Sequence, residues 1–270
     1  MQEIIDFLHL KKWSSEAKTF TKAAIEALMD DKTLEFEALI ELINGMDKDC
    51  QALIFYKSIL KVNSTFTNLI KSSYLALNKP NIGFIDIAVG EGEPALTSSE
   101  GARTQPHLGT SKSGEPTVII EFNNDYLDQA TDLGLVNTLY HELLHAHILN
   151  LYHEGKLLTK YPGYTSLNTA LNNYYSDDTH VIFGEAYIQE MHNIYVDFID
   201  LLAGSLVEYA TTYNISGIDL DYAKKLVWGG LKGNNVFTDN LTTAQQNESQ
   251  TLLGKENFNH SDAKSSKTCN

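Results

Sequence analysis

The stretch of residues 131–155 reads TDLGLVNTLYHELLHAHILNLYHEG and holds four of the nine histidines of the chain. Its apolar residues recur at intervals of three and four, which is the period of an α-helix with one buried face. Thr131 and Asp132 are typical of a helix start, and Gly155 is typical of a helix stop. The stretch therefore predicts a helix of at least about five turns, with a cluster of histidines near its middle.

The middle of this helix carries an HExxH motif. Residues four apart lie on one helix face with Cβ atoms about 5 to 6 Å apart, so His141 and His145 can bind one ion about 2 Å away. Glu142 lies one step round the helix, where a carboxylate can take a proton from zinc-bound water. The motif has a chance expectation of about 2% per sequence of this composition. We therefore predict His141 and His145 as Zn²⁺ ligands and Glu142 as the catalytic general base.

Two further histidines of the same helix are not expected to reach this ion. His147 lies about 200° round the helix from His145, and His153 lies about 120° from His141. We expect both to lie on the surface or behind the ligands.

Catalytic zinc needs a third protein ligand and leaves its fourth position to water. The extended motif HExxHxxGxxH is excluded, because Ile148 and Leu151 stand where it requires Gly and His. A long helix expected over residues 178–210 offers two other candidates. His180 lies on the apolar stripe of that helix, and Glu185 lies on its other side. We predict His180 as the third ligand, with Glu185 as the alternative.

The sequence leaves the oxyanion-stabilising group open. The candidates are Tyr140, Tyr164, Tyr174, Tyr175 and His192.

Two strands are expected ahead of the motif, IGFIDIAV at residues 82–89 and TVIIEF at residues 117–122. The segment between them is rich in Gly, Ser and Thr and is expected to be an exposed loop. Zincins commonly place an edge strand beside the active-site helix, to which an extended peptide adds. TVIIEF is expected to be either that edge strand or an ordinary half-buried strand.

The chain divides into three regions. Helical periodicity predicts a helical N-terminal region over residues 1–78. Residues 79–245 are expected to form a zincin-like α+β domain, in which the active-site helix packs on a small sheet beside a second, ligand-bearing helix. Residues 246–270 are polar and are expected to form a loosely held tail.

Composition restricts the partners. The formal net charge of −15 repels phosphate backbones and anionic lipid, so we expect neither a nucleic-acid nor a membrane partner. Nothing in the composition predicts the oligomeric state. With only Cys50 and Cys269, we expect two free thiols, with a bridge between them as the alternative.

The sequence suggests two cellular locations. Its start lacks a basic stretch, an apolar run and a small-residue cleavage site, so no export signal is expected in this chain. We expect a cytoplasmic location, or export as the end domain of a longer protein.

The motif and its surroundings, TLYHELLHAHI preceded by VIIEFNNDYLDQATDLGLVNTLY, resemble bacterial zincin domains of the SprT-like type. NKPNIGF, THVIFGEAYI and LVWGGLKGNNVF extend the resemblance more weakly, to about residues 79–240. The resemblance implies His141 and His145 as ligands, Glu142 as the catalytic residue and His180 as the downstream ligand. SprT-like proteases that act on DNA-crosslinked proteins carry basic or zinc-ribbon appendages, which this acidic chain with two cysteines lacks.

The predicted function is a zinc metallopeptidase that acts on a protein or peptide substrate. Two alternatives stay open: a non-catalytic module in which zinc staples two helices together, and a hydrolase of a non-peptide amide or ester. A structural zinc site closes its fourth position with a protein ligand, whereas a catalytic site leaves that position to water.

Overall fold

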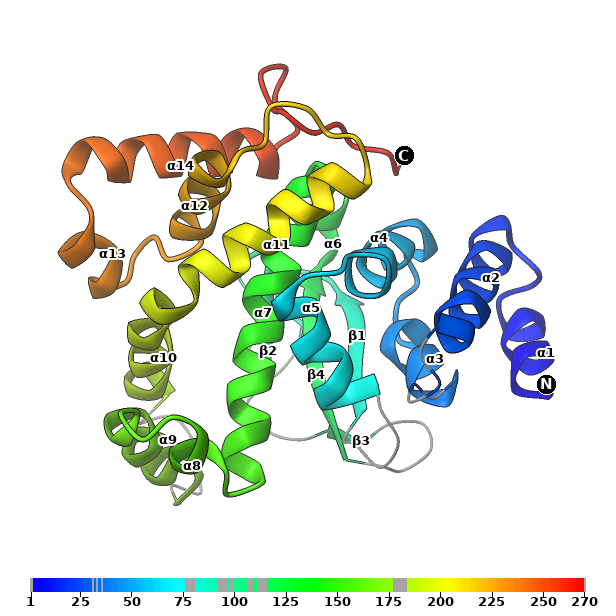
Figure 1. The fold of residues 1–270 in the computed structure, drawn as a ribbon, viewed down its shortest axis with the longest axis horizontal. Helices are drawn as coiled ribbons and strands as arrows, with labels where there is room; N and C mark the ends of the chain where they lie inside the picture. Colours follow the sequence, from blue (N-terminus) through cyan, green and yellow to red (C-terminus); the bar gives the residue numbers. More distant parts are fainter. Residues whose placement is uncertain are drawn as a thin grey trace.

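The chain folds into many helices around one small mixed sheet, as the computed structural model shows (Figure 1). The structure describes residues 2–30, 32, 34, 36–75, 81–91, 97, 100–105, 109–110, 116–176 and 184–269. This architecture agrees with the predicted α+β class.

The region before the sheet is helical, as predicted. Its elements are α1 (Gln2–Leu10), α2 (Ser15–Asp30), α3 (Phe36–Asn44), α4 (Asp49–Leu60), α5 (Thr65–Ile70) and the π-helix η1 (Lys71–Leu75). In Figure 1 these helices lie beside the sheet, with α1 and α2 farthest from the molecule's centre.

The sheet has four strands, and β4 is its central strand. Its strands are β1 (Asn81–Ile87), β2 (Ala102–Thr104), β3 (Gly109–Thr110) and β4 (Pro116–Asn123). β1 pairs with β4 in parallel, while β2 and β3 both pair with β4 in antiparallel fashion. Of the two alternatives for TVIIEF, the edge strand is wrong, because short strands within the expected loop pair with the second edge of β4.

One face of β4 packs into the core, as its alternating pattern predicts. Val118, Ile120 and Phe122 are buried on this face. The ring of Phe122 lies 4.4 Å from that of Phe55 in α4, measured between centroids. The N-terminal helices and the sheet therefore share one apolar core.

The second half of the chain is helical. Its elements are α6 (Asn124–Leu127), α7 (Asp132–His153), α8 (Leu157–Lys160), α9 (Thr165–Ser176), α10 (Gly184–Asn193), the 3-10 helix η2 (Ile194–Phe198), α11 (Ile199–Thr212), α12 (Leu220–Gly229), α13 (Asn235–Asn240) and α14 (Thr243–Asn257). The long helix expected from residue 178 is divided by η2, and its expected start lies outside the described residues.

Most of the expected loose tail is packed. α14 lies against α12, and a Cβ on Gly229 of α12 would lie only 2.9 Å from the Cβ of Leu253, so this close approach requires glycine. Beyond α14, the chain returns to α4, where Cys269 forms a disulfide with Cys50. The expectation of two free thiols is therefore wrong, and the bridge is formed.

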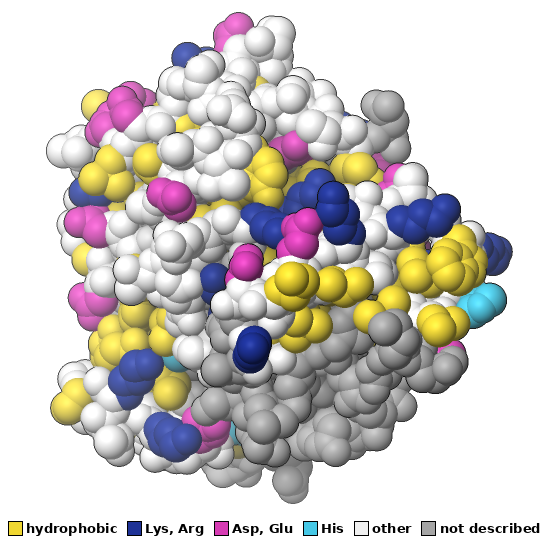
Figure 2. All heavy atoms as spheres, turned by 45° about the vertical axis from the view of Figure 1, so that its right-hand side comes forward, with side chains coloured by type: hydrophobic (Ala, Val, Ile, Leu, Met, Phe, Trp, Pro, Cys, Tyr) yellow, Lys and Arg dark blue, Asp and Glu magenta, His cyan; other side chains and the backbone are white. Residues whose placement is uncertain are grey.

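The face that carries the N-terminal helices has a mixed surface. Figure 2 shows basic and acidic side chains scattered among apolar ones there. The exposed large apolar residues of this region are Ile5, Trp13, Ile25 and Met29. Among the described helices, none combines the length and apolar character that a bilayer span requires.

Candidate metal centre

α7 provides the rigid platform of the site. The Thr131 side chain caps its N-terminus by accepting a hydrogen bond from the Gly134 N–H, and Gly155 follows its end with a positive φ of 66°. Most of the side chains along its 22 residues are buried, including Leu143 and Leu144 between the motif histidines. The predicted start and stop of this helix are confirmed.

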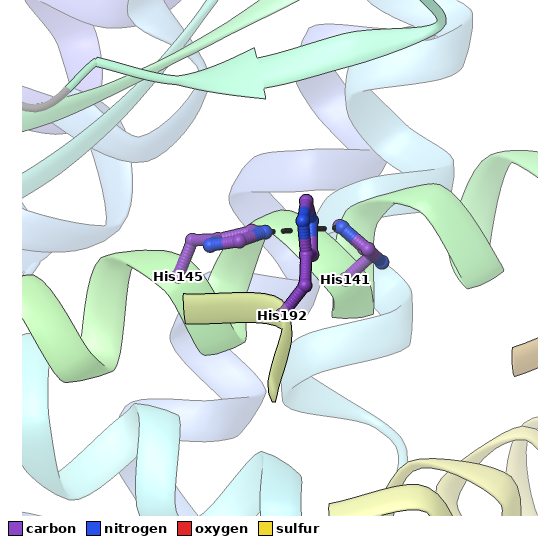
Figure 3. Close-up of side chains that lie close together, drawn as sticks. All are labelled: His141, His145 and His192. Carbon is purple, nitrogen blue, oxygen red and sulfur yellow. Dashed lines mark hydrogen bonds between the residues drawn. The ribbon is translucent and has the colours of Figure 1, made fainter. Parts of the chain in front are cut away.

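Three imidazoles converge on one point. His141 and His145 project from successive turns of α7, and their Nε2 atoms are 3.0 Å apart. His192 reaches them from the end of α10, and one ring nitrogen from each of the three residues lies within 4.8 Å of the others. Figure 3 shows the His141 and His145 rings facing each other, with the His192 ring rising toward the space between them.

This donor set fits a zinc ion. Two nitrogens that each lie about 2.05 Å from a tetrahedral ion are about 3.3 Å apart, close to the separation found between His141 and His145. A shift of His192 by about 1.5 Å brings its nitrogen to the same spacing. Among the described residues, the group contains no fourth His, Cys, Asp or Glu.

The three imidazoles are held in the neutral form that binds metal. Burial lowers the pKa of His141 and His145 well below the usual range, and repulsion between the neighbouring rings lowers it further. Burial also lowers the pKa of His192 to about 4, against the opposing effect of its hydrogen bond with Asn234. At neutral pH each ring therefore has a nitrogen lone pair available.

The predicted third ligands are not placed by the structure. His180 lies outside the described residues, and so does the side chain of Glu185, which follows the first residue of α10. Both therefore stay predictions. The sequence suggests His192 only as an oxyanion candidate, and the structure places it among the three converging histidines. No periodicity in the sequence indicates that the helix changes to the 3-10 helix η2 after Asn193.

Glu142 lies beside the histidines with its carboxyl group buried. Its side chain is only 6% exposed, and the Thr104 hydroxyl on β2 lies 2.9 Å from both its Oε2 and its backbone carbonyl oxygen, which share the one hydroxyl proton. Burial raises the pKa of Glu142 to about 7, the bond from Thr104 acts against this rise, and the charge of Glu100 adds to it. Such a carboxyl group can exchange a proton at neutral pH.

Tyr195, which the sequence did not single out, packs against one of the three histidines. The ring of Tyr195, in η2, lies 4.5 Å from that of His141, and its hydroxyl donates to the backbone carbonyl of His141. Tyr187 of α10 also lies near enough for the Glu142 charge to raise its pKa. Tyr187 belongs to the apolar stripe of the predicted helix, which could have identified it, whereas Tyr195 follows Ile194 and lies off that stripe.

The tyrosines proposed for the oxyanion have other partners. Tyr140 is buried in the core and donates to the Ser58 carbonyl. Tyr164 donates to Asp197, and Tyr175 forms a hydrogen bond with His153. Tyr174 packs its ring against that of Tyr187, with centroids 4.6 Å apart. None of these contacts involves the three histidines.

The two histidines excluded from the ion lie in different surroundings. His153 is exposed, in agreement with the prediction. His147 is 1% exposed, and its Nδ1 lies 3.4 Å from the Ser73 hydroxyl of η1. A surface position for His147 is therefore wrong, because α7 is covered on several sides.

Comparison with protein families, with curated proteins and with solved structures found no match for this chain. The resemblance to SprT-like zincins therefore remains a prediction from the residues.

Proposed function

We propose that this protein is a zinc-dependent metallopeptidase in which Glu142 acts as the general base. The observation that carries the proposal is the convergence of three neutral imidazoles beside a buried carboxyl group. A zinc ion held by these imidazoles would lower the pKa of a bound water from about 15.7 towards 7 and polarise a substrate carbonyl.

The chain's own residues supply the proton transfers. Glu142 takes the proton of the attacking water and returns it to the leaving amine. A pKa near 7 suits both steps, since the carboxylate must accept the proton and then release it. Thr104 orients the carboxylate through its hydroxyl, and Tyr195 supports the turn of α7 that carries His141.

β2 provides a place for an extended substrate. Gly101 and Gln105 direct backbone hydrogen bonds toward β4, so the alternation of an antiparallel strand turns the peptide groups of Ala102 and Thr104 outward. Among the described residues, no strand pairs with this outer edge. The outward Thr104 N–H already bonds the Glu142 carboxylate, so an extended peptide would add to β2 at Ala102 and lie beside Glu142, which supports a peptide as substrate.

The test is cleavage of an unfolded protein such as reduced casein. We expect activity in the zinc-loaded protein, loss of activity with a chelator, and recovery with added zinc. Glu142→Gln is expected to retain zinc and to lower kcat by at least about 1,000-fold, because the variant cannot accept the proton. Glu154→Gln, which changes an exposed glutamate after the end of α7, serves as the matched control.

Two results would contradict the proposal. One is a zinc-loaded protein that cleaves no unfolded protein or peptide. The other is cleavage at an equal rate by the wild-type and Glu142→Gln proteins, which would assign the activity to a contaminant or to another site.

One observation favours the alternative of a zinc staple. α10 packs mainly against α9, η2 and α13, and His192 is the residue through which it reaches the histidines of α7. Zinc that only staples these helices would raise the melting temperature without supporting cleavage. Thermal unfolding with and without zinc, measured beside the cleavage assay, separates the two functions.

A further inference from the structure

The turn between α12 and α13 lies directly against two of the three histidines. A Cβ built on Gly230 of this turn would lie 3.3 Å from Nδ1 of His141. Four residues later, the Oδ1 atom of Asn234 lies 2.9 Å from Nδ1 of His192. One short segment therefore contacts two of the three candidate ligands, one on each helix.

The hydrogen bonds of Asn234 fix which way its side-chain amide faces. Its Nδ2 group donates to the Leu231 carbonyl at 3.2 Å, and a carbonyl can only accept. The side-chain oxygen must therefore face His192, and Nδ1 of His192 must carry the proton that this oxygen accepts. That tautomer leaves the lone pair of His192 on Nε2.

The side chain of Asn234 does not cap the helix that it precedes. Asn234 precedes α13 with an extended backbone, φ −99° and ψ 150°, which is the position and conformation of a helix cap. Asparagine is among the preferred residues there because its side chain accepts from the helix's first N–H groups. In this protein it makes no such bond. The side-chain oxygen of Asn234 therefore bonds the ring of His192 instead of the first N–H groups of α13.

We infer that Asn234 is a positioning residue of the metal centre, which holds His192 as the Nδ1–H tautomer with Nε2 directed at the ion. The inference rests on the proposed function, since it takes His192 as a zinc ligand. Partners of this kind fix the orientation of a ligating histidine, and their loss typically weakens metal binding about 10- to 100-fold.

The first test measures zinc affinity by competition with a chromophoric chelator. Asn234→Ala is expected to raise the zinc Kd about 10- to 100-fold, whereas Asn234→Asp, which keeps the acceptor, stays within about threefold of wild type. Asn235→Ala changes the exposed neighbouring residue and is expected to bind zinc as the wild type does. The visible spectrum of the cobalt-substituted protein should change in Asn234→Ala alone, because only that variant releases the His192 ring.

The second test needs no variant. Nitrogen NMR of the metal-free protein with labelled histidine reads the tautomer of each ring, and we expect His192 to be protonated on Nδ1. Protonation of His192 on Nε2 would overturn the inference even if every variant were folded and active.

The outcomes separate this inference from the proposed function. Equal zinc affinity of Asn234→Ala and wild type, with affinity lost in His192→Ala, would overturn the role of Asn234 and leave the metal centre intact. Zinc affinity retained in His192→Ala but lost in His180→Ala or Glu185→Ala would overturn the ligand assignment on which the inference rests. Absence of zinc binding by the wild type would overturn both.

Discussion

At the scale of single residues, Thr104 determines where the proposed general base lies. The Thr104 hydroxyl donates a hydrogen bond to Glu142. The strand that carries Thr104 is held by the ion pair between Arg103 and Glu121, whose Nη2 and Oε2 atoms are 2.7 Å apart. Arg103 is the chain's single arginine. Arg103 and Thr104 point to opposite faces of β2. The ion pair fixes the register of β2 against β4, and this register places the Thr104 hydroxyl next to the Glu142 carboxylate.

Thr104→Val should impair catalysis without loss of zinc. Removal of the donor frees the carboxylate and destabilises its charged form, so kcat should fall by about 10-fold or more and the pKa of Glu142 should rise above its value of about 7. The rising limb of the pH profile of kcat/KM should therefore move to higher pH. Thr104→Ser, which keeps the hydroxyl, should restore the wild-type profile; an unchanged profile in Thr104→Val would show that the bond has no role.

His147 should make the fold sensitive to acid. Burial lowers its pKa to about 4, and its Nε2 has no hydrogen-bond partner among the described residues. The unfolded chain takes up a proton near pH 6.5, so the stability from the neutral ring is present above that pH and is lost as pH falls toward 4. The loss corresponds to about 3 kcal/mol.

His147→Leu is the variant that tests this prediction. Urea unfolding of the metal-free protein at pH 7 and pH 4 should show a smaller loss of stability for His147→Leu than for the wild type. His153→Gln, at an exposed histidine of the same helix, should behave as the wild type does. Parallel pH dependence of the wild type and His147→Leu would contradict the account.

At the scale of elements, α7 is anchored at its N-terminus by α14. The carboxyl group of Glu256 is completely buried and accepts hydrogen bonds from the Thr131 hydroxyl, the Tyr222 hydroxyl and the Lys264 N–H. The Thr131 hydroxyl in turn caps α7. The C-terminal helix is thus connected to the helix that carries the motif.

Glu256→Gln should destabilise the protein by about 2 to 3 kcal/mol, because an amide group then faces buried donors. Its zinc affinity should stay near that of wild type, since the anchor lies at the far end of α7 from the histidines. Glu248→Gln, at an exposed glutamate of α14 paired with Lys225, should have little effect. Chemical unfolding measures both, and equal stability of the two variants would exclude a special role of Glu256.

Periodicity predicted the elements whose patterns are local. α7, β1 and β4 lie where repeats of two or of three and four residues place them. α14 was missed because the residues that it buries, Ser249 and Glu256, are polar and carry no apolar stripe. β2 was missed because three residues in a Gly-rich segment give no period, although one of them, Thr104, holds Glu142.

The candidate site was predictable only where it depends on spacing within one helix. The spacing of His141 and His145 follows from helix geometry, so a single sequence indicates it. His192, Thr104 and Asn234 come from segments far away along the chain. Their approach depends on tertiary packing and on the change of helix type at η2, which a single sequence does not reveal.

At the scale of the whole molecule, a disulfide joins α4 to the C-terminal end of the chain. The Cys50–Cys269 disulfide spans 219 positions of sequence, and Thr268 beside it binds Asp132 at the start of α7. Such bridges persist in oxidising compartments and are rare in the reducing cytosol. An oxidising compartment would therefore preserve this bridge.

Breaking this bridge should cost stability. A disulfide that closes so long a loop restricts the unfolded chain, and its loss should lower the free energy of unfolding by about 2 to 5 kcal/mol. Cys50→Ser and Cys269→Ser should each unfold at lower urea concentration than the wild type. Thiol titration of the unreduced, denatured protein should find no free thiol, and two free thiols there would contradict the pairing.

The central claim is that His141, His145 and His192 bind one zinc ion and leave one coordination position to water. Anomalous diffraction at the zinc edge, from crystals of the zinc-loaded protein, tests it most directly. One strong peak is expected about 2 Å from a nitrogen of each of the three rings, with a water as the fourth ligand. A peak elsewhere, a fourth protein ligand, or His180 or Glu185 in the place of His192 would contradict it.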